Sequence, residues 1–188
     1  MAADWLVVGL GNPGAEYAGT RHNVGSDTVA LLAERHGGTL RRSKHRALTA
    51  EVRIGPVGVV LGFPQTYYNE SGQAVASLCR WHDLTVDRLV VVHDELDLPP
   101  GRLKLKLGGG LAGNNGLKSI KAHLHSDLFA RVRIGVGKPP GRMEGADHVL
   151  RRPGKAERTQ LDIAVQEAAD AVELLAADGP DRAMGRYN

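Results

Sequence analysis

Cysteine, aromatic side chains and long apolar runs are all scarce in this chain of 188 residues. The single cysteine, Cys79, excludes an internal disulfide framework and any metal site built from several cysteines. Uncharged apolar stretches end after about six residues, whereas a transmembrane helix needs about 20, so no membrane span is expected. Phe, Trp and Tyr together make up 4% of the chain, which argues against binding nucleic acid mainly by stacking bases.

The N-terminal region and the overall composition favour a protein of the cytoplasm. Asp4 precedes the first apolar run, which reverses the charge order of a secretory signal peptide. A lone cysteine is typical of a reducing compartment. Hydrophobic residues make up 42% of the chain and charged residues 24%, as in globular proteins large enough to bury a core. We therefore expect one cytoplasmic domain over residues 1–188.

Positive charge is concentrated in one part of the chain. The formal net charge is only +3, but residues 102–142 hold nine Lys or Arg and a single acid, Asp127. That segment carries +8 and the remainder of the chain −5. Such a segment is typical of a protein with a polyanionic partner. Charge alone leaves open the alternative of a solvated Lys and Arg surface without a partner.

The hydrophobic pattern predicts alternating strands and helices. Strands are expected at residues 5–10, 48–54, 57–63, 89–92, 103–107 and 132–136, with the second and third forming a hairpin. Helices are expected from Val24 up to Gly37, over residues 69–81, from Leu117 to Leu124, and through Leu161 to Leu175 until Gly179-Pro180. No repeat or long linker divides the chain. The expected fold class is a single α/β domain with a mixed sheet.

A glycine-rich loop follows the first expected strand. Gly9, Gly11 and Gly14 match the dinucleotide fingerprint G-x-G-x-x-G, so a nucleotide-dependent enzyme is one alternative. Pro13 removes a backbone N–H from this loop, and six further residues separate it from the expected helix. The acid about 20 residues later, Glu34, lies within a helical pattern and not after a second strand. These features disfavour a dinucleotide site.

Polar residues gather at comparable places elsewhere in the pattern. The first loop also contains Asn12 and His22, while Asn69, Asp94 and the pair Asn114-Asn115 follow other expected elements. Open α/β sheets place their sites at the carboxyl ends of strands. A lone histidine is usually structural, and an Asn before Gly usually supplies a turn or a helix cap. Their common placement makes a polar site the more interesting hypothesis.

Five motifs in order resemble the bacterial-type peptidyl-tRNA hydrolase family: VVGLGNPGAEYAGTRHNVG, FPQTYYNESG, VVHDELDLPPGRLKLKLGGG, GNNGLKSI and FARVRIGVGKP. The resemblance runs from about Trp5 to the C-terminal helix. It implies a monomeric, single-domain, cofactor-free esterase with a twisted mixed sheet flanked by helices. The implied substrate is peptidyl-tRNA, held by its acceptor stem and 3′ end. The implied reaction cleaves the ester between the peptide and the 3′ ribose, which recycles tRNA after premature release from the ribosome.

The resemblance also implies roles for individual residues. His22 corresponds to the catalytic base of the family and Asp94 to its partner acid. Asn12, Asn69 and Asn115 correspond to amides of the site, and we expect Tyr17 and Tyr67 in the adjoining motifs to contact substrate as well. The residues expected to meet the tRNA are Lys104, Lys106 and Arg133.

Two positions depart from the family pattern. The family commonly has Met where Tyr68 stands, and its glycine loop commonly has His where Asn114 stands. We expect activity to survive because His22, Asp94 and the three asparagines remain. The departures remove any role of a histidine in that loop and affect how the peptide part is held.

The residue types support hydrolysis by water without a covalent intermediate. An imidazole oriented by a carboxylate suits the base. Ser71 and Ser119 adjoin site motifs, but no G-x-S-x-G elbow is present, and Cys79 is expected on the inward face of a helix. The acids Asp94, Glu95 and Asp97 offer a Mg²⁺ site as an alternative, although we expect Glu95 and Asp97 to face solvent or cap the turn before Pro99.

A different class of function also fits the same fold. A relative that has lost catalysis would act only as an RNA-binding protein. The presence of His22 and Asp94 together with the three site asparagines favours the hydrolase.

Overall fold

The structure is a computed structural model that describes residues 2–188. Its seven strands form one mixed sheet in the order β2-β3-β4-β1-β5-β7-β6. In chain order the strands are β1 (Trp5–Gly9), β2 (Arg41–Arg42), β3 (Ala47–Ile54), β4 (Val57–Pro64), β5 (Leu89–Glu95), β6 (Leu103–Leu107) and β7 (Ala130–Gly135). The predicted α/β class with a mixed sheet is confirmed.

The centre of the sheet is parallel and its edges are antiparallel. Strand β1 pairs in parallel with β4 and β5, and β5 pairs in parallel with β7. The predicted hairpin is present as β3 and β4, and β6 runs antiparallel to β7. The carboxyl ends of β1, β4, β5 and β7 therefore lie side by side along one side of the sheet, which we call its carboxyl edge. Open α/β sheets hold their sites at this edge.

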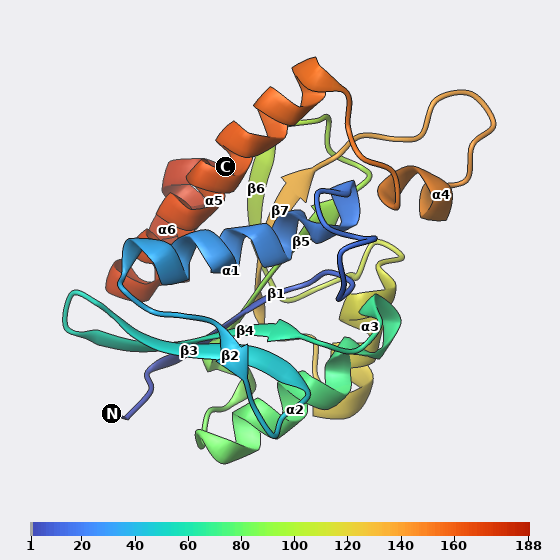
Figure 1. The fold of residues 1–188 in the computed structure, drawn as a ribbon. Helices are drawn as coiled ribbons and strands as arrows, with labels where there is room; N and C mark the ends of the chain where they lie inside the picture. The colour runs from blue at the N-terminus through green and yellow to red at the C-terminus, as the bar shows by residue number, and fades with distance from the viewer. Residues whose placement is uncertain (1) are drawn as a thin grey trace.

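Helices cover both faces of the sheet (Figure 1). The helices are α1 (Val24–Arg35), α2 (Ser71–Trp81), α3 (Asn115–Leu124), α4 (Gly145–Val149), α5 (Lys155–Asp178) and α6 (Pro180–Tyr187). Helices α1, α5 and α6 pack on one face and α2 and α3 on the other. The three 3₁₀ turns are η1 (Arg21–Asn23), η2 (Tyr68–Glu70) and η3 (Val86–Arg88).

Alternation along β1 divides the core into two layers. Trp5 and Val7 join the layer under α1 and α5, whereas Leu6 and Val8 join the layer under α2 and α3. All four are buried, as a central strand covered on both faces requires. Among residues 2–188, no helix combines the length and the apolar character needed to cross a membrane.

One strand and two α-helices, namely β2, α4 and α6, were not predicted from the hydrophobic pattern. Strand β2 has two residues and α4 has five, so neither is long enough to give a periodic signal. Helix α5 ends at Asp178 as expected, but Pro180 then begins α6. Proline is well suited to the first turn of a helix, so the same Gly-Pro pair ends one helix and starts the next.

Candidate active site

The loop after β1 brings His22 to the edge of the sheet. His22 lies in η1, directly before α1. Two glycines allow α1 to begin almost in contact with the strands: a Cβ on Gly9 would lie 2.1 Å from the Gly25 carbonyl oxygen, and a Cβ on Gly25 would lie 2.2 Å from that of Val92. Gly9, the first glycine of the pattern that resembled a dinucleotide fingerprint, thus has a packing role together with Gly25, and this packing fixes the start of α1 and the histidine before it.

His22 and Asp94 are in direct contact. Nδ1 of His22 lies 2.7 Å from Oδ2 of Asp94, which is the next-to-last residue of β5. Asp94 is 4% exposed, and the His22 side chain is 17% exposed. A carboxylate at Nδ1 requires that nitrogen to carry the proton, so the neutral ring keeps its lone pair on Nε2. The preceding His93 points to the other face of the sheet, where burial lowers its pKa to about 4.

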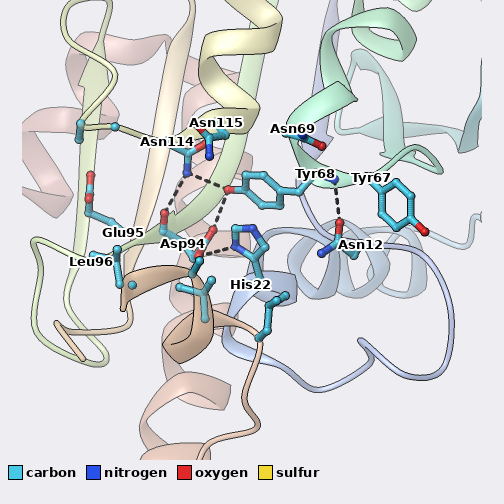
Figure 2. A pocket seen from close by; sticks show the side chains of 16 residues that line it. Asn12, His22, Tyr67, Tyr68, Asn69, Asp94, Glu95, Leu96, Asn114 and Asn115 are labelled. Carbon is cyan, nitrogen blue, oxygen red and sulfur yellow. Dashed lines mark hydrogen bonds and ion pairs between the residues drawn. The ribbon is translucent and has the colours of Figure 1, made fainter. Parts of the chain in front are cut away.

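Tyr68 completes the surroundings of the Asp94 carboxylate. Its hydroxyl donates to Oδ1 of Asp94 over 2.7 Å and accepts from Nδ2 of Asn114 over 2.8 Å. Its ring stacks on the His22 imidazole with 3.5 Å between centroids and 11° between planes. Burial and the Asp94 charge raise the pKa of Tyr68 well above its usual value, so the hydroxyl remains a donor. Figure 2 shows these contacts converging on Asp94.

Asn12 is held from two sides. Its backbone N–H donates to Oδ1 of Asn23 over 2.9 Å, and Nδ2 of Asn23 donates back to the Asn12 carbonyl over 2.9 Å. Its side-chain Oδ1 accepts the backbone N–H of Tyr68 over 2.7 Å. Because that contact uses the carbonyl end of the amide, the Nδ2 end is the one left to donate elsewhere.

These groups line a cavity of about 470 Å³ at the carboxyl edge of the sheet. Its wall also includes Tyr67, Asn69 and Asn115, which are exposed side chains. The structure therefore brings together most of the predicted site residues, namely Asn12, His22, Tyr67, Asn69, Asp94 and Asn115 (Figure 2). Val149 at the end of the short helix α4 and Leu150 after it supply an apolar side of the same cavity.

Tyr17 does not line this cavity. It lies in a neighbouring cavity of about 510 Å³, together with Arg46 and Glu70. Tyr67, which is 62% exposed, lines both cavities and so lies on the boundary between them.

The basic residues of strands β6 and β7 differ in their exposure to solvent and in their hydrogen bonds within the protein. Lys104 is exposed, whereas Nζ of Lys106 donates to the Gly110 carbonyl over 3.0 Å. Partial burial, with Arg131 and Arg133 nearby, lowers the pKa of Lys106 from its usual value. Arg131 is 1% exposed and donates to the carbonyls of Gly110 and Asp127 over 2.6 and 2.7 Å. One charge of the basic segment is thus used inside the protein to hold the glycine loop.

Arg133 is paired with an acid. Its Nη1 lies 3.5 Å from Oε1 of Glu95, and the two side chains are 17% and 5% exposed. Oε2 of Glu95 accepts the backbone N–H of Asp97 over 3.3 Å, so Glu95 is buried and caps the turn while Asp97 is exposed to solvent. Within residues 2–188 no group of three or more metal-ligating side chains is present.

Three side chains near the site motifs could in principle act as nucleophiles, but two hydroxyls are hydrogen-bonded to the backbone and the one thiol stays protonated. Oγ of Ser71 donates to the Tyr68 carbonyl over 2.6 Å, and Oγ of Ser119 accepts the Gly72 N–H over 2.9 Å. Cys79 is buried as expected, and burial raises the pKa of its thiol to about 11. None of the three lines the cavity.

Tyr68 and Asn114 line the cavity as well, although the motifs assign neither of them a role. Asn114 also caps α3, because its Oδ1 accepts the Leu117 N–H over 3.0 Å. The expected cap role of an Asn before this helix therefore belongs to Asn114 and not to Asn115. One feature of the sequence could have pointed to them: Tyr68 directly precedes Asn69, and Asn114 directly precedes Asn115, so each stands beside a predicted site asparagine.

Comparisons of this chain with known families, sequences and structures all find peptidyl-tRNA hydrolases. A family model described as Peptidyl-tRNA hydrolase matches residues 6–188. The chain is 50% identical over 183 residues to a peptidyl-tRNA hydrolase of Anaeromyxobacter sp. (strain K), covering 97% of this chain and 95% of the relative. It is 51% identical over 181 residues to one from Paenarthrobacter aurescens (strain TC1), covering 95% and 93%. The crystal structure of the peptidyl-tRNA hydrolase from Acinetobacter baumannii superposes with a TM-score of 0.93 at 39% identity, covering 100% and 96%.

Proposed function

The chain belongs to the bacterial-type peptidyl-tRNA hydrolase family and hydrolyses the ester bond of peptidyl-tRNA, and from this premise we propose that the cavity around His22 and Asp94 is its active site. The observation that carries the proposal is the 2.7 Å contact between Nδ1 of His22 and Oδ2 of Asp94 at the wall of that cavity.

His22 acts as the base for the attacking water. Nε2 takes a proton from water as the water oxygen bonds to the ester carbonyl carbon. Asp94 holds the tautomer and stabilises the imidazolium that results. The tetrahedral intermediate then collapses: the bond from carbon to the 3′ ribose oxygen breaks, and that oxygen receives the proton from His22. Water and side chains of this chain account for every atom transferred, and no acyl-enzyme forms.

The site asparagines divide the remaining work. Asn12 directs Nδ2 to the oxygen that gains charge, because its Oδ1 is already engaged by Tyr68 N–H. Asn69 and Asn115 are exposed on the cavity wall and offer donors and acceptors to the peptide backbone. A neutral amide suits this role because it pairs with peptide groups of any sequence.

The tRNA lies on the basic side of the molecule. Lys104, Lys106 and Arg133 meet phosphates of the acceptor stem, which gives affinity without reading sequence. Tyr17 and Tyr67 contact the 3′ end from the neighbouring cavity. The protein acts as a monomer in the cytoplasm, where it recycles tRNA released early from the ribosome, and it needs no cofactor.

Replacement of Asp94 tests this active site. Asp94→Asn places an amide donor at Nδ1 of His22 and favours the wrong tautomer, so kcat for an N-blocked aminoacyl-tRNA falls by about 10²-fold or more. The matched control is Asp97→Asn, an exposed carboxylate three residues later, which leaves kcat unchanged. An Asp94→Asn variant that binds tRNA and retains full kcat would rule the dyad out.

A further inference from the structure

Tyr68 contacts three of the polar groups on which the proposed chemistry depends. Its backbone N–H donates to Oδ1 of Asn12, its hydroxyl donates to Oδ1 of Asp94, and its ring stacks on His22. Tyr68 is 4% exposed, so these contacts are made in a buried setting where hydrogen bonds are strong.

The tyrosine is held so that it has one orientation. A Cβ on Gly116 would lie 2.6 Å from Cε1 of Tyr68, so the glycine at the start of α3 leaves room for the ring edge. Nδ2 of Asn114 donates to the Tyr68 hydroxyl over 2.8 Å, which leaves the hydroxyl hydrogen for Asp94. Asn114 is itself fixed by the Leu117 N–H. Tyr68 and Asn114 are therefore bonded to each other.

The hydroxyl and His22 share one carboxylate. Asp94 accepts His22 on Oδ2 and Tyr68 on Oδ1, each over 2.7 Å. A hydrogen bond to one oxygen disperses part of the negative charge that would otherwise stabilise the imidazolium at the other. The stacked ring covers one face of the imidazole and limits its rotation, which keeps Nε2 directed along one line.

We propose that Tyr68 is a positioning residue for His22 and that, with Asn114 holding its hydroxyl, it sets the pH at which His22 becomes a competent base. The proposal rests on the proposed function in taking His22 as the base. Asn114 thus serves Tyr68 and the α3 cap, and substrate contact is left to Asn115.

Few other charges face His22. The titratable groups of the cavity wall are Asp94 and Glu95 on β5 and Tyr67 and Tyr68 around η2. Glu95 is paired with Arg133, and the wall residues from α4 and the position after it carry no charge: Gly145, Ala146, Val149 and Leu150. In η1 itself, Arg21 turns away to a two-point pair with Glu157 over 2.7 and 2.9 Å. Removal of the Tyr68 hydroxyl therefore leaves more of the negative charge of Asp94 to act on His22, and few other charged groups mask this effect.

The test is the pH dependence of kcat/KM in Tyr68→Phe. This variant keeps the stacked ring and loses only the hydroxyl, so the carboxylate stabilises the imidazolium more strongly. We expect the midpoint of the acidic limb to move to higher pH by about 0.5 to 1 unit, with KM for substrate unchanged. Asn114→Ala weakens the same contact and shifts the midpoint in the same direction, and the double variant behaves like Tyr68→Phe alone. Tyr187→Phe, at a tyrosine in α6 that lines neither cavity, leaves the profile unchanged.

A second measurement does not depend on turnover. The imidazole resonances of His22, identified by their loss in His22→Asn, are followed by NMR against pH in the wild type and in Tyr68→Phe. The same upward displacement is expected. Superimposable titrations and superimposable pH profiles would overturn the role of Tyr68. Full activity in His22→Asn would instead defeat the proposed function, while the NMR comparison would still report whether Tyr68 acts on His22.

Discussion

The ring of Tyr68 lies parallel to the imidazole of His22, with 3.5 Å between their centroids. The two residues come from different segments, η2 after β4 and η1 after β1, and the Asp94 carboxylate at the end of β5 bonds to both. Three adjacent parallel strands thus each deliver one member of the arrangement to the same edge of the sheet. The geometry is set by buried hydrogen bonds before substrate arrives, which is the condition for efficient proton transfer.

Lys104 and Arg133 are predicted to respond differently to alanine substitution. Lys104 is exposed, so Lys104→Ala raises KM with little change in kcat or stability. It also reduces the slope of log binding constant against log salt by about one. Arg133→Ala additionally leaves the buried Glu95 carboxylate without its partner and lowers the free energy of unfolding by about 1–3 kcal/mol.

Arg133→Lys is the matched control, because it keeps a cation near Glu95 and a charge for phosphate. KM is measured with an N-blocked aminoacyl-tRNA, and stability by urea denaturation. A selective fall in kcat for Lys104→Ala, at unchanged KM, would contradict its assignment as a phosphate contact. Equal stability of Arg133→Ala and the wild type would show that the Glu95 pair contributes nothing to the fold.

Asp27 is predicted to destabilise the protein at neutral pH. Burial raises the pKa of this carboxyl to about 6, with Asp162 adding to the effect and Arg158 opposing it. The folded chain therefore binds the proton more tightly than the unfolded chain, so stability is greatest below the unfolded value and decreases as pH rises from about 4 to 6. Asp27→Asn removes this loss and should increase the free energy of unfolding at pH 7.5 by about 1–3 kcal/mol.

The advantage of Asp27→Asn should disappear below about pH 4, where both states of the wild type are protonated. Urea denaturation at pH 4 and pH 7.5 makes the comparison. Glu34→Gln, an exposed carboxylate in the same helix, serves as the control and should show no such pH-dependent difference. A wild type that is more stable than Asp27→Asn at pH 7.5 would contradict the prediction.

The strands and long helices follow from the sequence because each buries a continuous or periodic apolar face. Residues 5–10 and 89–92 are predicted as buried strands, and β1 and β5 are fully buried strands at these places. Periodicity cannot indicate α4, because its five residues make fewer than two turns. It also cannot indicate that Arg131 lies inside the protein, because an alternating Arg-Val-Arg pattern favours a solvated face until the glycine loop covers it.

The site follows from the sequence only in part. His22, Asp94 and the amides are recognisable by motif, and their convergence follows from the parallel strand order. The contacts of Tyr68 are different in kind. They depend on a ring fitting beside Gly116 and on a hydroxyl reaching Asp94, and both are set by packing between α3 and η2 rather than by any local pattern.

The most direct test of the account is turnover by His22→Asn, compared with His36→Asn. Both histidines contact a carboxylate at 2.7 Å, His22 with Asp94 and His36 with Glu173, but only His22 lines the cavity. With N-blocked aminoacyl-tRNA in EDTA and without nucleotide, His22→Asn should lose at least about 10²-fold in kcat while still binding tRNA, and His36→Asn should turn over like the wild type. Wild-type turnover by His22→Asn would contradict the central claim that this imidazole activates the water.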